Sequence, residues 1–133
     1  QEGENGMRLA HVWFGPNFHL FRHSHPLGDC TYYVAAGELT MGKRRLKAGS
    51  TIFVPNEMPY KFVAGPDGVE VLEFRSGGSI PGKPKMKIEE TSLASIQKII
   101  DDYKANQHLW KIPPNFSDTG HVKPHEGSKQ LTP

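Results

Sequence analysis

Hydrophobic and polar residues alternate in short runs from about residue 7 to residue 75, and turn-forming residues interrupt the runs. Alternation with a period of two is typical of strands that bury one face. The runs predict strands at residues 8–14, 18–25, 31–35, 38–41, 51–54, 60–63 and 69–75, with turn signals at 15–17, 26–29, 48–50 and 65–68. Short strands separated by Gly, Pro, Asn and Asp favour an all-β sandwich or barrel over alternating helices and strands.

The period changes after a Gly-, Pro- and Lys-rich connection at residues 76–87. Glu89 and Glu90 precede a segment with helical spacing, where acidic side chains favour a helix N-terminus. The apolar positions of this segment are Leu93, Ile96, Ile99, Ile100 and Tyr103. They predict a helix over residues 92–106 whose apolar stripe packs on the barrel or on a partner subunit.

We therefore divide the chain into a β-barrel over 1–90, a C-terminal helix over 91–110 and a tail over 111–133. The tail is rich in proline and is expected to be extended or flexible. A chain of 133 residues with these elements is long enough to bury one core as a single domain.

Composition and charge limit the partners and the compartment that we expect for this protein. The net charge of +2 does not indicate a nucleic-acid partner, and the basic run at 43–45 lies between two predicted strands, where it decorates a hairpin. Cys30 is the single cysteine, so no internal disulfide forms, in keeping with a reducing compartment. The sequence contains neither an apolar run long enough to span a bilayer nor a signal-peptide pattern, and we expect a cytoplasmic protein.

The segment HSHPLGDC holds the best candidate chemistry. Residues two apart on a strand point to the same face, so His19, Phe21, His23 and His25 are predicted to share one face. Two adjacent imidazoles are able to hold one divalent transition metal ion. On the next predicted strand, Cys30 is the nearest additional donor along the chain.

Several of these residues stand at the spacing of cupin motifs. The first cupin motif reads Gly-x5-His-x-His, then three or four residues, Glu, x6 and Gly, and His23, His25 and Gly37 match it. Gly49 and Pro55, in GSTIFVP, match the start of the second motif. The stretch from residue 15 to residue 74, about half of the chain, thus resembles the cupin superfamily. The resemblance implies the double-stranded β-helix, or jelly-roll, barrel.

The departures from the motifs bear on the site. The metal-binding Glu of the family falls on Cys30 with the longer spacing and on Asp29 with the shorter one. The second-motif His falls on Tyr60, its Gly on Glu57, and the first Gly of the first motif on Asn17. Of the four usual ligands, the resemblance carries over only the two histidines.

Three interpretations of the site remain open. In the first, His23, His25 and Cys30 bind a divalent transition metal such as Fe, Zn, Mn or Ni, with a position open for water or substrate. In the second, Tyr60 or His19 supplies the missing ligand. In the third, no metal is bound, and the histidines and Tyr60 act as acid–base or hydrogen-bonding groups.

Three functions follow. The resemblance implies a small-molecule enzyme, and the aromatic barrel favours a metal-dependent dioxygenase within that range. The alternatives are a non-catalytic ligand- or metal-sensing module, and a metal-free lyase or isomerase with Tyr60 and His23 as acid and base. In each case the partner is a small organic molecule rather than a nucleic acid or a membrane. The helix and the tail are further expected to join two copies into a homodimer.

Overall fold

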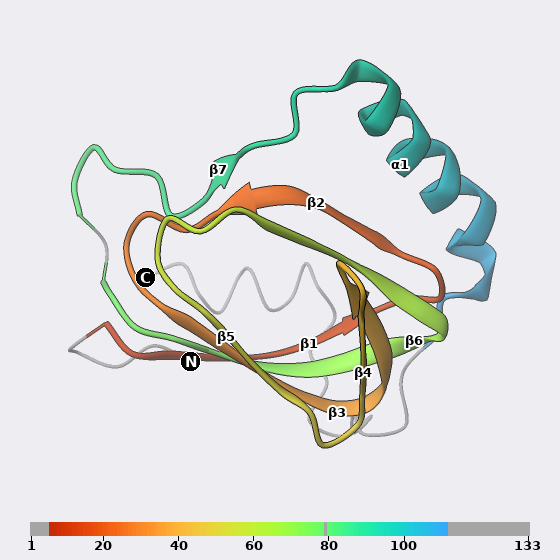
Figure 1. Cartoon of the computed structure of the whole chain (residues 1–133), viewed down its shortest axis with the longest axis horizontal. Helices are drawn as coiled ribbons and strands as arrows, with labels where there is room; N and C mark the ends of the chain where they lie inside the picture. The colour runs from red at the N-terminus through yellow and green to blue at the C-terminus, as the bar shows by residue number, and fades with distance from the viewer. Residues whose placement is uncertain (1–5, 79, 112–133) are drawn as a thin grey trace, which may run out of the picture.

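A computed structural model describes residues 6–78 and 80–111 and shows a β-barrel with one helix against its side (Figure 1). The elements in chain order are β1 (Arg8–Phe14), β2 (His19–Ser24), β3 (Cys30–Met41), β4 (Arg44–Lys47), β5 (Thr51–Val54), β6 (Tyr60–Arg75), β7 (Lys87–Ile88), α1 (Leu93–Asn106) and the 3-10 turn η1 (Gln107–Leu109). This confirms the all-β jelly-roll barrel with a C-terminal helix. The tail beyond Lys111, predicted to be extended, lies outside the described residues.

Two long strands, β3 and β6, hold the barrel together because each takes part in both of its faces. Their first and last parts pair with each other, with Cys30 opposite Arg75 at one end and Thr40 opposite Val63 at the other. β1 and β5 extend the sheet at the first end, and β4, β2 and β7 extend it at the second. All these pairings are antiparallel.

The prediction of separate strands at 31–35 and 38–41, and at 60–63 and 69–75, was wrong. Each pair is one continuous strand, and the expected turn at 65–68 is a bulge, because one residue of β3 stands opposite four residues of β6 between the Gly37–Val69 and Leu39–Ala64 pairs. Gly37 has φ +71° and Gly68 has φ +82°, a conformation that glycine adopts without a steric penalty. The turn residues here bend the strands from one face of the barrel to the other.

Two residues of the basic run at 43–45, Arg44 and Arg45, belong to a strand that the sequence analysis missed. β4 pairs with the end of β3 through a tight turn, with Arg44 opposite Met41 and Lys47 opposite Glu38. Arg45 donates from Nε and Nη2 to the Glu38 carboxylate at 2.7 and 2.8 Å. The three exposed positions of β4 all carry charged side chains, so the strand has little apolar alternation to detect in the sequence.

A second bulge, in β2, changes which side chains face inward. His19 and Leu20 lie opposite Val63 and Phe62, but His23 lies opposite Tyr60, so two residues of β2 face one residue of β6. Leu20 and His23 therefore share the interior, although they are three residues apart. The predicted common face for His19 and His23 was wrong, and His19 points outward toward α1.

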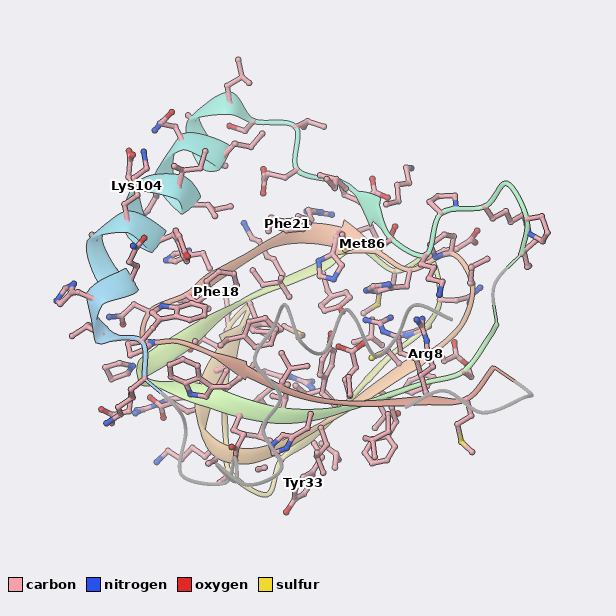
Figure 2. All side chains as sticks on the ribbon, turned by 180° about the vertical axis from the view of Figure 1, so that it is seen from behind. Arg8, Phe18, Phe21, Tyr33, Met86 and Lys104 are labelled. Atoms are coloured by element: carbon pink, nitrogen blue, oxygen red, sulfur yellow. The ribbon has the colours of Figure 1, made fainter. Side chains whose placement is uncertain are left out.

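The core lies between the two faces of the barrel. Its ten buried hydrophobic residues are Cys30, Tyr32, Val34, Leu39, Val54, Tyr60, Phe62, Ala64, Val69 and Val71. Strand alternation explains the set, as buried Tyr32 adjoins Tyr33, which points away from the barrel in Figure 2. The predicted shared face of Cys30, Tyr32 and Val34 is confirmed.

The helix forms where the sequence predicts it. Ser92 is its N-cap, and the Ser92 hydroxyl accepts a hydrogen bond from the Ser95 N–H at 3.3 Å. The helix lies along β2, at the edge of the barrel (Figure 1). Within the described residues, no helix is both long enough and apolar enough to cross a bilayer.

Candidate active site

His23 and His25 lie side by side where β2 ends, with ring centroids 4.9 Å apart. His23 is buried, and its Nδ1–H donates to the Phe21 carbonyl at 2.8 Å. Nδ1–H of His25 donates to the Lys85 carbonyl at 3.0 Å. Because a carbonyl only accepts, both neutral rings keep their lone pair on Nε2. The sequence pair is thus pre-oriented with two basic nitrogen atoms away from the backbone.

Two tyrosines from β3 and β6 meet beside the histidines. The hydroxyls of Tyr32 and Tyr60 are 2.5 Å apart, and the Tyr60 ring lies 4.4 Å from the His23 ring between centroids. Both hydroxyls are in the barrel interior. Burial raises the pKa of both phenols, so each is protonated at neutral pH.

Arg75, the last residue of β6, places a guanidinium group in the middle of this cluster. Its Nη2 donates to His25 Nε2 at 2.7 Å and reaches Tyr60 Oη at 3.4 Å. Its Nε is ion-paired with the Glu73 carboxylate. Burial opposes the positive charge of Arg75, but the neighbouring groups, the Glu73 carboxylate first among them, together raise the pKa of the guanidinium above its usual range.

The cluster opens into a cavity of about 290 Å³. His23, His25, Tyr32 and Arg75 line it together with Arg8, Glu73, Lys85, Met86, Phe14 and Leu20. Three cationic side chains thus surround the cavity against one carboxylate. Nε of Arg8 is buried without a hydrogen-bond partner among the described residues. This cavity is suited to an anionic group.

Burial and the nearby charge of Arg75 also determine the protonation state of the two histidines. Burial lowers the pKa of His25 to about 4. The hydrogen bond to the Lys85 carbonyl opposes this decrease, and the charge of Arg75 adds to it. Burial lowers the pKa of His23 as well. Both imidazoles are therefore neutral at neutral pH, with the Nε2 lone pair of His23 free of any partner among the described residues.

Comparison with known proteins identifies the architecture. No family model matches the sequence, and no curated protein does. A protein with a double-stranded β-helix domain from Klebsiella pneumoniae aligns with a TM-score of 0.52 and 22% identity over 65% of this chain and 77% of its own. A protein with a cupin-like fold from Ralstonia eutropha aligns with a TM-score of 0.51 and 19% identity over 86% of this chain and 79% of its own. The chain has the cupin fold.

A third cupin match has a named activity. The DMSP lyase DddQ from Ruegeria pomeroyi aligns with a TM-score of 0.54 and 20% identity over 65% of this chain. The alignment spans 44% of the lyase, so this chain corresponds to less than half of that protein.

The two histidines that the resemblance implies as metal ligands lie together, but the part of the chain that the structure describes adds no third donor to them. Among residues 6–78 and 80–111, no three His, Cys, Asp or Glu side chains form a group that could hold a metal ion. Burial raises the pKa of the Cys30 thiol to about 11, which disfavours the thiolate that a metal needs. The cationic side chain of Arg75 donates a hydrogen bond to the Nε2 lone pair of His25, so this lone pair is already in use. The described donor set therefore does not fit a resident metal ion.

The structure brings four of the five predicted site residues to the barrel interior and separates the fifth. His23, His25 and Tyr60 form one cluster, and Cys30 is buried in the adjoining core. His19 lies outside it, with Nε2 3.0 Å from Asp102 Oδ2 of α1. A catalytic role for His19 remains a prediction that this cluster does not support.

Sequence reasoning missed Arg75, Glu73 and Tyr32. The available signal was that Glu73 and Arg75 are two apart on a predicted strand, and so share a face, while their neighbours Leu72 and Phe74 are apolar. In a sequence alone, two charged residues on one face of a strand are usually interpreted as a solvent-exposed face. Only the pairing of Arg75 with Cys30 across the sheet carries the guanidinium to the histidines.

Proposed function

We propose that this cupin-fold protein is a metal-independent enzyme, a lyase or isomerase, that moves protons on a small organic carboxylate. The observation that carries the proposal is the Arg75 guanidinium, whose Nη2 lies 2.7 Å from His25 Nε2 inside the cavity. A fixed cation there favours an anionic substrate and opposes a divalent metal ion. A cavity of about 290 Å³ limits the substrate to a small molecule.

Arg75 and Arg8 are the groups that hold the carboxylate. Glu73 and His25 position the Arg75 fork through its Nε and one of its Nη2 hydrogens, which leaves other N–H groups for an oxyanion. The buried, unpartnered Nε of Arg8 gains an acceptor when an anion enters. A carboxylate bound between two guanidinium groups is fixed in orientation as well as in charge.

His23 is the base. Its Nδ1–H is held by the Phe21 carbonyl, so the Nε2 lone pair is the one available to take a proton. The negative charge of a bound substrate raises the proton affinity of His23, which burial otherwise keeps neutral.

Tyr60 is the acid. In a lyase reaction, a C–H bond breaks as its proton moves to His23 Nε2, and its electron pair forms the new C=C bond. The bond to the leaving group breaks in turn, and the Tyr60 proton moves to that group. Arg75, within 3.4 Å of Tyr60 Oη, stabilises the phenolate, and Tyr32 donates to it at 2.5 Å. Proton return from His23 to Tyr60 through solvent restores the site.

Fold similarity to the DMSP lyase supports the lyase class only at the level of the fold. An isomerase uses the same first step and returns a proton to a different carbon atom. Both reactions begin with transfer of a carbon-bound proton to His23, which makes that transfer the step to test.

The test is proton exchange with solvent, which does not require the product to be known. The protein is incubated in D2O with a panel of small carboxylates, and loss of C–H signals is followed by proton NMR in the presence of EDTA. We expect exchange or elimination with a subset of the panel. His23→Gln and Tyr60→Phe are expected to slow it at least about 100-fold, since each removes an acid–base group.

Arg44→Met is the matched control for Arg75→Met, since Arg44 lies on β4 outside the cavity. Arg75→Met is expected to abolish the reaction, while Arg44→Met leaves it unchanged. Activity that vanishes with EDTA and returns with a transition metal would contradict the proposal in favour of a metal enzyme such as a dioxygenase. Carboxylate binding with no exchange would instead indicate a sensing module.

A further inference from the structure

A second cavity lies outside the barrel, because α1 is attached to it mainly at one end. The C-terminal part of the helix is fastened by the His19–Asp102 contact at 3.0 Å and by Asn17 Nδ2, which donates to Asn106 Oδ1 at 2.9 Å. The Tyr103 ring also packs edge-on against Phe18. No residue of the helix is fully buried. The earlier turns therefore stand off from the sheet rather than being sealed against it.

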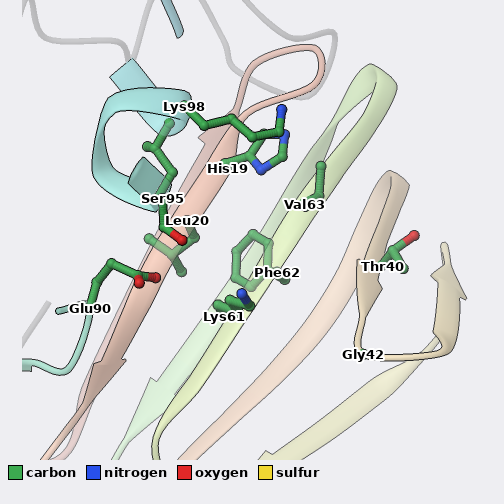
Figure 3. Close-up of a pocket in the computed structure, with 11 residues that line it drawn as sticks. His19, Leu20, Thr40, Gly42, Lys61, Phe62, Val63, Glu90, Ser95 and Lys98 are labelled. Atoms are coloured by element: carbon green, nitrogen blue, oxygen red, sulfur yellow. The ribbon is translucent and has the colours of Figure 1, made fainter. Parts of the chain in front are cut away.

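The space between these turns and the sheet is a cavity of about 340 Å³ (Figure 3). Its floor is a cross-strand row, since Val63 on β6 lies opposite both His19 on β2 and Thr40 on β3. Ser95 and Ile99 of α1 form its roof. The apolar part of the lining consists of Leu20, Phe62, Val63 and Ile99. The site is thus distinct from the interior cluster, which lies on the other side of the same strands.

The charges around this cavity are unevenly paired. Lys98 Nζ is 2.6 Å from Asp102 Oδ2, so its charge is already balanced. Lys61 also lines the cavity, and no carboxylate among the described residues lies within ion-pair distance of it. Glu90 lies away from His19 and Lys98, toward the other end of the cavity (Figure 3). The cavity therefore offers one cation without an ion-pair partner among the described residues, an apolar wall, and one carboxylate that lies at the same end as Lys61 in Figure 3.

We propose that this cavity binds a small monocarboxylate with an apolar body, its carboxylate on Lys61 and its body against Val63 and Ile99. A charge-assisted hydrogen bond fixes the head, and burial of the body against these two aliphatic side chains supplies the remaining affinity. The proposal is independent of the proposed function, because Lys61, Val63 and Ile99 do not line the interior cavity.

The apolar wall makes the site selective. A dicarboxylate of the same length would place its second charge against Val63 and Ile99, where no cation balances it, and burial of an unpaired charge is unfavourable. A neutral alcohol of the same length would leave Lys61 unpaired. The expected order of affinity is therefore octanoate above octanol, and octanol above octanedioate.

The test is a titration of the whole protein with these three probes, followed through the amide signals of Thr40, Val63 and Ile99 in two-dimensional NMR. His25 and Arg75 amides are followed in the same spectra, so binding at the interior cluster is recorded separately. We expect octanoate to shift the first group saturably and Lys61→Met to weaken that binding about tenfold.

Lys104→Met is the matched control, since Lys104 lies in the last turn of α1 and does not line the cavity. It should leave octanoate binding unchanged. Saturable shifts that are confined to His25 and Arg75 would overturn the proposal. So would octanoate binding that is equally strong in Lys61→Met, with the variant shown to be folded by its unshifted remaining signals.

Discussion

At the scale of single residues, Arg75 decides the chemistry of the interior. His23 and His25 have the tautomer and orientation usual for metal ligands, since each donates Nδ1–H to a carbonyl and keeps its lone pair on Nε2. The Arg75 guanidinium then occupies the neighbourhood of His25 Nε2. On the proposed function, this cation makes the two-histidine site one for an anion rather than for a metal ion.

This account predicts the effect of Arg75→Met on metal binding. The variant frees His25 Nε2 and leaves the Glu73 carboxylate without its partner, so two imidazoles and a carboxylate become available to a cation. We expect the affinity for Zn²⁺ to rise at least about tenfold, which corresponds to about 1.4 kcal/mol. Calorimetric titration of tag-free protein measures it.

Arg44→Met serves as the control, and elemental mass spectrometry of the unmutated protein is the companion measurement. We expect well under one equivalent of any transition metal per chain. Stoichiometric metal in the unmutated protein, lost in His23→Ala, would refute this view and restore the metal site that the His-x-His pair predicts. Retention of that metal in Cys30→Ser would exclude Cys30 as a ligand.

At the scale of elements, the glycines of β3 and β6 let two long strands serve both faces of the barrel. Gly37 stands where β3 passes the four-residue bulge of β6, and a methyl group there would overlap the Gly68 carbonyl oxygen. Gly42, in the turn before β4, has φ +59° but has open space around it. The two positions share a backbone conformation and differ only in crowding.

Gly37→Ala and Gly42→Ala therefore separate these two costs. Gly42→Ala is expected to lower the free energy of unfolding by about 1 kcal/mol, the cost of a left-handed conformation alone. Gly37→Ala adds a backbone clash and is expected to cost about 3 kcal/mol or more. Urea denaturation measures both, and equal losses would show that the bulge accommodates a side chain.

The attachment of α1 is expected to depend on pH. Burial lowers the pKa of His19, and the charges of Lys98 and Lys61 act in the same direction, whereas Asp102 opposes them. Glu90 is a further charged residue of the cavity under α1, which His19 also lines. When the helix detaches, His19 regains its ordinary pKa near 6.5 and binds a proton more readily than in the attached state. The attachment is therefore fully stable above about pH 6.5 and weakens as the pH falls below it.

Hydrogen exchange of the α1 amides at pH 7 and pH 5 tests this prediction. We expect lower protection at pH 5, after correction for the intrinsic pH dependence of exchange, in the unmutated protein. His19→Gln should remove most of the difference because glutamine does not titrate. A helix whose protection is the same at both values would rule out the proposed linkage.

At the scale of the whole molecule, the helix leaves apolar surface that the barrel does not cover. Ile96, Ile100 and Tyr103 are 36%, 40% and 42% exposed, and the half-buried face of α1 is formed instead by Ser95, Ile99, Asp102 and Asn106. The predicted apolar stripe thus lies at the side of the helix. The homodimer expected from the sequence, with α1 against a second copy, stays a prediction.

The dimer is tested by sedimentation velocity at micromolar concentration. We expect a dimer for the unmutated protein and a monomer for Ile100→Glu, which places a charge in the apolar stripe. Ala105→Glu, on the opposite side of the helix, should remain dimeric. A monomer in the unmutated protein would contradict the prediction.

Local physics accounts for what could be predicted. The alternation in β1 and β5 gave their bounds without error, and the spacing of apolar residues together with Ser92 gave the helix. The His23–His25 pair is likewise local, since residues two apart in sequence stay close in any arrangement. Prediction failed where one strand depends on another, as in the outward turn of His19.

The sequence by itself determined the class of fold, the helix with its cap and the pair of histidines, because each depends on residues within a few positions of one another. Only the tertiary structure decided what surrounds that pair. Arg75 is fifty residues from His25 in sequence, and the pairing of β3 with β6 brings it there. A one-residue change of register reverses which side chains face inward, so the chemistry of the barrel depends on long-range pairing that no local pattern encodes.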